Sequence, residues 1–465
     1  MSEELTWLPA WRLRDLIRTR EVSPVEVLDH FLDRIEEHND TLHAFAVVDR
    51  AEARDRAGWA EKALAAGEEV GPLHGLPTAV KENIAVAGHE WLGSTADRGP
   101  AKASRDSLTV SRLRDAGAVL VGINTMMGTT RGGLQGLAHP DGFNWAAEAR
   151  NPWDTTRTAG WSSSGGASST AAGLLPFAIG TDGGGSTRLP AAYSGVVGVH
   201  TTTNLIPTVD YDHAQYPSLT QSHGPLTRNV VDAAMVLQVL AGPDGRDFTC
   251  LAIDPPDYMA DIDKGVDGMR LGWTDDFGFT EIYAMEESDR VIAAVRQAAQ
   301  GFASIGAKVE TVDTVWEDFF PGQGATGMFG GAAPDAIRVP SLDEWGLALD
   351  LRQRNWLRFR EALTTYDVLL SPTSQLLART LEDWDSVWTK EGARFAHGTF
   401  AHPYCSHTMM FNWLGFPAVT VPCGFVDGLP IGLQIIGKPG SEAHLFRVAN
   451  AFEKAFPHDQ HPPAS

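Results

Sequence analysis

The chain contains few cysteines and no long apolar run. Its three cysteines, Cys250, Cys405 and Cys423, are too few and too scattered among 465 residues to form a disulfide framework. No apolar run reaches the roughly 18 residues of a transmembrane helix. The first residues, MSEELTWLPAW, also lack the basic and apolar regions of a secretory signal. We therefore expect a cytoplasmic protein that makes no membrane contact.

Basic residues are scarce as well. The chain has 37 Lys and Arg against 59 Asp and Glu, which gives a formal net charge of −22. Such a charge repels phosphate backbones and anionic lipid surfaces, so we expect no nucleic-acid partner. Hydrophobic residues make up 43% of the chain, enough for a large core, and this composition excludes a disordered protein.

The motifs of several common enzyme classes are missing. The segment Gly180–Ser186 is rich in glycine but lacks the lysine of a phosphate-binding loop, and no G-x-G-x-x-G opens a helix after a strand. No G-x-S-x-G elbow and no H-E-x-x-H motif occur. The sequence thus gives no support to nucleotide binding, to an α/β-hydrolase mechanism or to a zinc-protease mechanism, and we expect no cofactor.

One group of potential metal ligands lies in the C-terminal third. His397, His402, Cys405 and His407 follow one another at spacings that metal ligands can have. The stretch around them, His-Gly-Thr-Phe-Ala-His-Pro-Tyr, is rich in proline and aromatic residues. This composition favours a loop beside a pocket over a metal centre, and we expect no bound metal.

Helix and strand patterns alternate along the chain. A helix is expected to begin at Ser23-Pro24-Val25-Glu26, where Ser23 is the N-cap and Glu26 completes a capping box. Further helices are expected at Ala51–Ala66, Asp106–Asp115, Arg290–Ile305, Trp345–Leu363 and Glu442–Phe456, and strands at Thr78–Val86, Ala118–Gly122, Lys308–Val312, Val368–Leu370, Ala418–Val421 and Ile431–Ile436. This alternation predicts an α/β protein with a central mixed β-sheet covered by helices on both faces.

The most informative stretch is Gly160–Gly195. It holds two glycine/serine segments, Ser162–Gly166 and Asp182–Ser186, separated by the apolar segment Ala171–Ile179. A flexible linker would be polar throughout, so we expect ordered backbone, with the apolar segment forming a helix between the two. Successive backbone N–H groups in a glycine-rich turn can converge on one oxygen, which is what an oxyanion hole requires.

A serine nucleophile in this turn would need a base. Lys81 is a candidate because it lies in a stretch that otherwise resembles a buried strand, and burial favours the neutral amine. A solvated lysine on an edge strand is the simpler interpretation of the same residues. Likewise, Gly183-Gly184-Gly185-Ser186 taken alone is typical of an ordinary turn.

Four segments, in order, resemble the amidase signature family of Ser-cisSer-Lys hydrolases. They are Pro72–Gly88 (PLHGLPTAVKENIAVAG), the first glycine/serine segment (GWSSSGG), the second (GTDGGGSTRLPAA) and Phe411–Phe425 (FNWLGFPAVTVPCGF) followed by GLPIGLQIIG. The resemblance covers nearly the whole chain. It implies the amidase signature fold in a single amidase domain over 1–465, composed of an N-terminal helical flank (1–66), a signature core (71–230), a variable region with the substrate pocket (231–410) and C-terminal core strands and helix (411–456).

The resemblance also implies roles for individual residues. Ser186 would be the nucleophile, Lys81 the neutral base, and a serine of the first segment would relay the proton between them through a cis peptide bond. The oxyanion hole would be formed by the backbone N–H groups of Gly183, Gly184, Gly185 and Ser186. Asp182 and Arg188 would support the loop. The partner would be a small-molecule amide, with esters and carbamates reacting by the same route.

Two serines compete for the relay position. Matching Ser-Ser-Gly-Gly directly selects Ser163, whereas an ungapped alignment from Ala171 to Ser186 selects Ser162. Because the family pattern tolerates serine at the position of Ser164, no gap is needed, and we expect Ser162. The sequence departs from the family at Trp161, where a glycine is usual, at Thr187, and at His200-Thr201, but at no catalytic group.

The substrate pocket is less well defined. Trp161, Phe319, Phe320 and Met328 are its expected lining residues, and they favour an apolar or aryl group, although large cores use aromatic residues anyway. The glycine-rich stretch 319–339 has the composition of a pocket wall and equally that of a surface insertion. A homodimer is expected from base rates alone. The rival function is the glutaminase component of a tRNA-amidating amidotransferase. Arg188-Leu189-Pro190 counts against it, because that branch usually has Arg-Gln-Pro.

Overall fold

The structure is a computed structural model that describes residues 2–91, 101–127, 148–208, 220–320, 341–383, 402–458 and 460–463. Its centre is an 11-stranded sheet in the order β1-β5-β2-β8-β10-β9-β14-β15-β13-β11-β12. Strand β2 is parallel to β5 and β8, and β11 is parallel to β12 and β13, while the remaining pairs are antiparallel. The sheet is therefore mixed, as predicted.

The strands of this sheet come from nearly the full length of the chain. They are β1 (Phe45–Val48), β2 (Pro77–Lys81), β5 (Val119–Asn124), β8 (Phe177–Asp182), β9 (Val197–His200), β10 (Ser222–Thr227), β11 (Arg270–Trp273), β12 (Lys308–Thr311), β13 (Val368–Pro372), β14 (Ala418–Val426) and β15 (Leu429–Ile436). Two small sheets pair β3 (Glu90–Trp91) with β4 (Ala101–Lys102) and β6 (Arg150–Asn151) with β7 (Asp154–Thr158).

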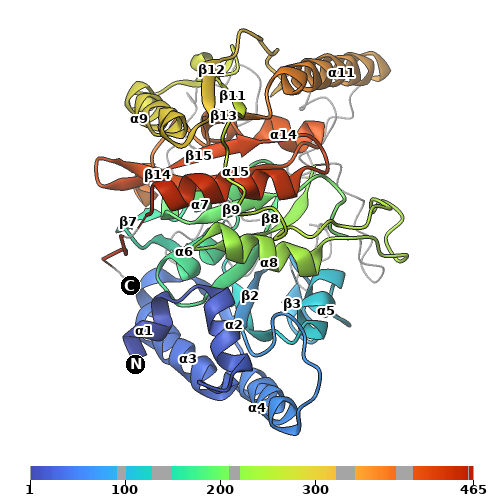
Figure 1. Ribbon diagram of the computed structural model, residues 1–465, viewed down its shortest axis with the longest axis vertical. Helices are drawn as coiled ribbons and strands as arrows, with labels where there is room; N and C mark the ends of the chain where they lie inside the picture. Colours follow the sequence, from blue (N-terminus) through green and yellow to red (C-terminus); the bar gives the residue numbers. More distant parts are fainter. Residues whose placement is uncertain are drawn as a thin grey trace.

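Helices surround the sheet (Figure 1). They are α1 (Ser2–Trp7), α2 (Ala10–Arg18), α3 (Pro24–Leu42), α4 (Arg50–Ala66), α5 (Leu108–Asp115), α6 (Ser164–Ala171), α7 (Arg188–Ser194), α8 (Val230–Leu240), α9 (Ser288–Gln300), α11 (Leu342–Thr365), α13 (His402–Cys405), α14 (Met409–Leu414) and α15 (Glu442–Ala455), with 3-10 turns η3 (Thr280–Tyr283) and η4 (Gly301–Ile305). In Figure 1 the N-terminal helices α1 to α4 gather at one end of the sheet, and α9 and α11 at the other. No helix in these described ranges is long and apolar enough to cross a membrane.

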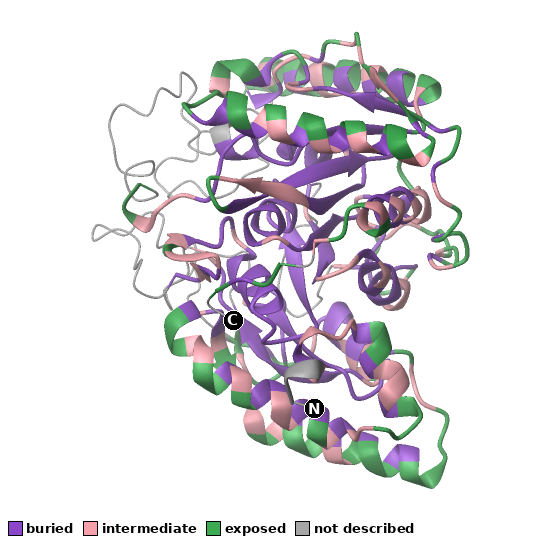
Figure 2. Cartoon of the chain, turned by 60° about the vertical axis from the view of Figure 1, so that its left-hand side comes forward, coloured by how far each residue is buried: buried purple, intermediate pink, exposed green. Residues whose placement is uncertain are grey.

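Successive residues of β9 contact helices on opposite faces of the sheet. Val197 and Val199 belong to the large core that includes residues of α8 and α15. Gly198, between them, faces α7, and a Cβ at this position would lie 2.6 Å from the Cβ of Ala191. Since successive strand residues point to opposite faces, α7 lies on the face opposite α8 and α15. Figure 2 shows the sheet strands as buried and the outer helices as exposed on one side. The predicted two-sided covering is confirmed.

Most expected elements are confirmed, including the capping box in which Ser23 and Glu26 exchange hydrogen bonds at the start of α3. The helix expected over Ala171–Ile179 is wrong. Helix α6 ends at Ala171, and the apolar residues that follow enter the buried strand β8 at Phe177. Gly173 has a positive φ of 65° and Pro176 cannot continue a helix, so the chain must turn here.

Candidate active site

The predicted functional residues meet at one edge of the sheet. The neighbouring strands β2 and β8 are parallel, and they end at Lys81 and Asp182 respectively. The carboxyl ends of parallel strands in an open α/β sheet are where ligands usually bind. Ser162 lies two residues before the start of α6, and Ser186 lies in the turn between β8 and α7, so both serines belong to segments that begin or end at this edge.

Lys81 is fully enclosed at the end of an interior strand. Its side chain is 1% exposed, and its Nζ lies 2.8 Å from Oγ of Ser162, 2.8 Å from Oγ1 of Thr181 and 3.2 Å from the carbonyl oxygen of Thr181. Strand β2 lies between β5 and β8, so the solvated edge-strand lysine that the sequence allowed is excluded. Three oxygen atoms therefore hold the amine in one position.

Burial lowers the pKa of Lys81 to about 7, although the negative charges of Asp182 and Glu82 oppose this shift. A large fraction of the amine is thus neutral near neutral pH and can accept a proton. A second buried nitrogen base, His223, lies across from Thr181 in the register of β10 and β8. Burial and the charge of Lys81 lower the pKa of His223 to about 4, so this imidazole is neutral beside the lysine.

The two candidate relay serines have different environments. Ser162 is partly exposed and receives the Lys81 hydrogen bond. Ser163 is 1% exposed, and its Oγ donates to the carbonyl of Thr181 at 3.1 Å and accepts from the Thr181 N–H at 3.3 Å. Ser163 thus fixes α6 to β8, whereas Ser162 faces the amine.

The cis peptide bond implied by the resemblance is absent. All peptide bonds in the part of the chain that the structure describes are trans, so this expectation is wrong. The trans form is favoured at non-proline residues by about 3–4 kcal/mol.

Ser186 follows the glycine turn with its hydroxyl unengaged. It is 5% exposed, and no residue of the described ranges hydrogen-bonds to its Oγ. The backbone N–H groups of Gly183, Gly184 and Ser186 likewise have no acceptor among those residues. The N–H of Gly185 donates to Oδ1 of Asp182 at 2.6 Å, so the expectation that Gly185 contributes to the oxyanion hole is wrong.

A buried ion pair holds this turn. Nε and Nη2 of Arg188 donate to the carboxylate of Asp182 at 2.9 and 3.1 Å, and both side chains are fully buried. Burial opposes the charge of Asp182, but Arg188 outweighs it and holds the pKa of this carboxyl well below its usual range. Thr187, a departure from the family pattern, adds a hydroxyl hydrogen bond to the same carboxylate at 2.8 Å.

Several residues that the sequence did not single out complete this support. Asn412 accepts from Arg188 at 2.5 Å and donates to the backbone carbonyl of Asp182 at 2.8 Å. Gln434 accepts from Arg188 at 2.7 Å, and Thr408 donates to the carbonyl of Gly184 at 2.8 Å. Asn412 and Gln434 lie in segments that carry the family resemblance, which was the available signal for them.

Three of the four expected pocket residues lie in one aromatic cluster. Trp161, Phe319 and Phe320 are buried and belong to the core group that includes Tyr404 and Trp413. Trp161 directly precedes Ser162, so the cluster reaches the candidate site. Met328, the fourth expected lining residue, lies outside the described residues.

The expected absence of a metal at the histidine cluster stays a prediction. His397 and the side chain of His402 lie outside the described residues. Cys405 is buried against Met409 with its Sγ 3.9 Å from the Met409 sulfur. His407 Nε2 lies 2.8 Å from the carbonyl of Asp275 and its Nδ1 lies 3.1 Å from Oγ of Ser406, so both ring nitrogens have hydrogen-bond partners.

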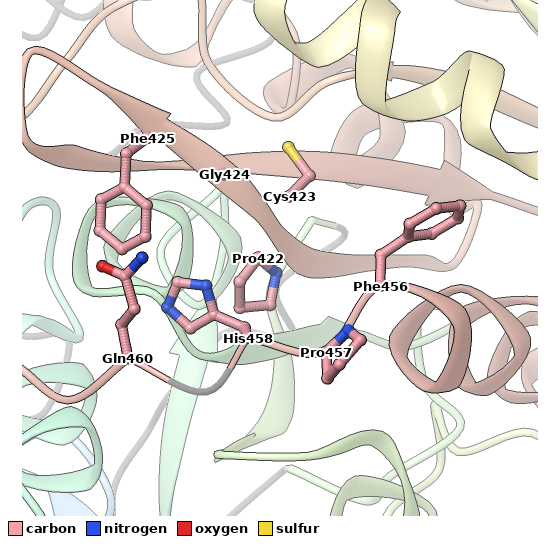
Figure 3. A pocket seen from close by; sticks show the side chains of 8 residues that line it. All are labelled: Pro422, Cys423, Gly424, Phe425, Phe456, Pro457, His458 and Gln460. Atoms are coloured by element: carbon pink, nitrogen blue, oxygen red, sulfur yellow. The ribbon is translucent and has the colours of Figure 1, made fainter.

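A separate surface pocket lies away from these residues (Figure 3). Its volume is about 220 Å³, and it lies between the outer end of β14 and the segment after α15. It is lined by Pro422, Cys423, Gly424, Phe425, Phe456, Pro457, His458 and Gln460. None of the candidate site residues described above lines it, so we assign it no part in the chemistry.

Comparison with known proteins identifies the family. The Amidase family model matches residues 26–320 and 343–446. The chain therefore belongs to the amidase family, the enzymes of the amidase signature that act on C–N amide bonds. A glutamyl-tRNA(Gln) amidotransferase subunit of Desulforudis audaxviator is 31% identical over 512 residues, covering 98% of this chain and 97% of that protein. Acylamidase of Rhodococcus erythropolis is 30% identical over 496 residues, covering 100% and 98%.

Solved structures agree with this placement. A bacterial aryl acylamidase of the amidase signature family superposes with a TM-score of 0.81 at 26% identity, over 98% of both chains. The structure of 6-aminohexanoate cyclic dimer hydrolase has the same TM-score at 23% identity over 99% of both chains, and this likeness concerns the fold alone. The family resemblance and the fold class derived from the sequence are both confirmed.

Proposed function

We propose that this chain hydrolyses an amide bond of a small molecule through Ser186 as nucleophile, Ser162 as proton relay and Lys81 as base. The observation that carries the proposal is the 2.8 Å contact between Nζ of Lys81 and Oγ of Ser162, at the sheet edge where the Ser186 turn begins. A buried amine with a pKa of about 7 is suited to accept a proton at neutral pH.

The reaction would proceed in two halves. Oγ of Ser186 attacks the carbonyl carbon, while its proton passes to Ser162 and the proton of Ser162 passes to Lys81. The N–H groups of Gly183, Gly184 and Ser186 would stabilise the oxyanion. The proton then returns to the leaving nitrogen, the C–N bond breaks and the amine departs. Water attacks the acyl-enzyme by the same route, which releases the acid and restores Ser186.

The aromatic cluster that includes Trp161 supports a proposal for the substrate class. Trp161, Phe319 and Phe320 lie in one buried aromatic cluster, which favours an apolar or aryl substituent on the scissile amide. Aryl esters and carbamates present the same carbonyl to the nucleophile and have better leaving groups, so they are secondary substrates in this proposal.

Substrate and nucleophile can be tested together. The purified chain is assayed on a panel of anilides, primary amides, aryl esters and carbamates, and Ser186→Ala is compared with Ser304→Ala, an exposed serine whose Oγ bonds only the nearby Gly301 carbonyl. We expect turnover of at least one anilide, loss of that turnover in Ser186→Ala and no loss in Ser304→Ala. Full activity of Ser186→Ala on every substrate would refute the proposal.

A second candidate function is that of an amidotransferase component that hydrolyses glutamine for a tRNA-amidating complex. The similarity to such components is as high as that to the acylamidase, which favours this interpretation. Leu189, where that branch usually has glutamine, is fully buried in the aromatic cluster with Trp161, which counts against it. Glutaminase activity that appears only with copurified tRNA-binding subunits would support this candidate, and anilide turnover by the isolated chain would exclude it.

A further inference from the structure

The peptide unit between Gly184 and Gly185 is held at both of its polar ends. Its N–H, on Gly185, donates to Oδ1 of Asp182 at 2.6 Å. Its carbonyl oxygen, on Gly184, lies 2.8 Å from Oγ1 of Thr408, a residue 224 positions away in the sequence. Asp182 lies on the nucleophile's own segment, whereas Thr408 comes from the C-terminal part of the chain, between α13 and α14.

The hydrogen of the Thr408 hydroxyl must point at Gly184. Oγ1 also lies 3.3 Å from the carbonyl oxygen of Cys405, but two oxygens at 2.8 Å repel unless a proton lies between them, and a carbonyl cannot donate one. The contact is close because Gly185 has a φ of +120° and no side chain. A Cβ there would lie 2.2 Å from Oγ1 of Thr408.

The adjoining peptide unit depends on this one. The carbonyl of Gly185 accepts from the N–H of Leu189 at 2.7 Å, at the start of α7. Because the carbonyl and N–H of a trans peptide point in opposite directions, the N–H of Ser186 points away from α7. Displacement of the unit between Gly184 and Gly185 would shift the Cα atoms at both of its ends, and with them the adjoining N–H groups of Gly184 and Ser186.

We propose that Thr408 is a positioning residue for the oxyanion hole, and that its hydroxyl holds the Gly184–Gly185 peptide so that the N–H groups of Gly184 and Ser186 face the substrate carbonyl. This inference rests on the proposed function of Ser186. Thr408 touches neither substrate nor nucleophile in this role. It acts on the transition state, where the oxyanion carries full charge, more than on the bound substrate.

The test compares three changes at Thr408 with one matched control. Thr408→Val keeps the shape and removes the hydroxyl, Thr408→Ala removes it with less crowding, and Thr408→Ser keeps it. The control is Thr227→Val at the far end of β10, where a fully buried threonine donates to the Asn229 carbonyl at 2.7 Å. Thr227 pairs with Phe177, five residues along β8 from Asp182, which is about 16 Å at the rise of a strand.

We expect Thr408→Val and Thr408→Ala to lower kcat about 10- to 100-fold with little change in KM, less than the 10²–10³ loss when an oxyanion donor is removed outright. Thr408→Ser should keep kcat near that of the wild type. Thr227→Val should also keep the wild-type kcat, although its thermal stability falls to that of Thr408→Val. The affinity for phenylboronic acid, which forms a tetrahedral adduct with a reactive serine, should fall in parallel with kcat.

Two outcomes of the kinetic comparison would overturn the inference. One is a wild-type kcat in both Thr408→Val and Thr408→Ala, and the other is a loss in Thr408→Ser as large as that in Thr408→Val, which would show that packing and not the hydroxyl matters. The rate at which a fluorophosphonate labels Ser186 is measured in every variant. If the wild type and the Thr408 variants are labelled equally fast, the inference about Thr408 fails while the proposed function of Ser186 stands. If Ser186 of the wild type is not labelled, the proposed function fails.

Discussion

Nζ of Lys81 and Oγ of Ser162 lie 2.8 Å apart although 81 positions separate the two residues in sequence. The contact exists because β2 ends where α6 begins, so the last residue of a buried strand meets the residues before a buried helix. At this distance a proton can pass directly between the amine and the hydroxyl.

Removing the amine should abolish catalysis without harming the fold. Lys81→Met keeps the length and apolar character of the side chain, and we expect kcat to fall by about 10²–10⁴, the usual contribution of a general base. Lys308→Met, at an exposed position on the edge strand β12, is the matched control and should keep full activity. Activity of Lys81→Met within a few-fold of the wild type would show that another group is the base.

The pH profile should follow the neutral form of Lys81. Because burial lowers the pKa of this amine to about 7, kcat/KM should rise with pH and reach half its plateau near pH 7. Glu82 raises the pKa of Lys81, so Glu82→Gln should move the midpoint to lower pH. A profile that is flat between pH 5.5 and 8.5, or one that falls as pH rises, would contradict this assignment.

Stability should depend on pH through the same group. In the folded chain Lys81 loses its proton near pH 7, whereas in the unfolded chain it does so near its ordinary value of 10.5. Between these two pH values the unfolded chain binds more protons, so the free energy of unfolding should rise with pH from about 7 to 10.5. Urea titrations of the wild type and Lys81→Met at pH 7 and 9 measure this, and the rise should be smaller in Lys81→Met.

The sequence predicted the elements whose signals are local. The capping box at Ser23 and Glu26 needs only neighbouring residues, and short apolar runs predicted six strands of the sheet, β2, β5, β12, β13, β14 and β15. The strands β1, β8, β9, β10 and β11 were not predicted. A short apolar run such as Ala171–Ile179 fits a buried strand as well as it fits a helix, so the run alone does not decide between the two. Gly173, with its positive φ, marks the turn that separates α6 from β8, but the conformation of a glycine cannot be predicted from its identity alone.

The site was predicted only as far as the family resemblance reached. Lys81, Ser162 and Ser186 could be named, since they lie in matching motifs. The acceptor of the Gly185 N–H could not be predicted, because the orientation of the Gly184–Gly185 peptide depends on both Asp182 and Thr408. A contact between residues 224 positions apart is set by the whole sheet, and no local pattern encodes it.

The choice between the two serines can be settled by a pair of variants. Ser162→Ala removes the hydroxyl that contacts Lys81, and we expect kcat to fall by about 10²–10⁴. Ser163→Ala removes hydrogen bonds to the backbone of Thr181, so it should lower stability by about 1–3 kcal/mol and kcat by less than tenfold. The reverse order of kcat values would make Ser163 the relay.

The buried pair of Asp182 and Arg188 should dominate the stability of the nucleophile turn. Arg188→Met leaves the Asp182 carboxylate buried without its cation, and we expect a loss of about 3–5 kcal/mol in the free energy of unfolding. The matched control is Arg290→Met, whose partner Asp427 is half exposed, with an expected loss below about 1 kcal/mol. Both are measured by urea unfolding at pH 7.

Lowering the pH should reduce the difference in the free energy of unfolding between Arg188→Met and Arg290→Met. Arg188 holds the pKa of Asp182 well below its usual range, so the stability that the carboxylate contributes is present above its ordinary pKa and is lost as pH falls below that value. Arg188→Met no longer resists protonation of Asp182, and the neutral acid is cheaper to bury than the carboxylate. The deficit of Arg188→Met relative to the wild type should therefore shrink between pH 7 and pH 4, while that of Arg290→Met stays small. An equal loss for the two variants at pH 7 would show that the buried pair contributes no more than a surface one.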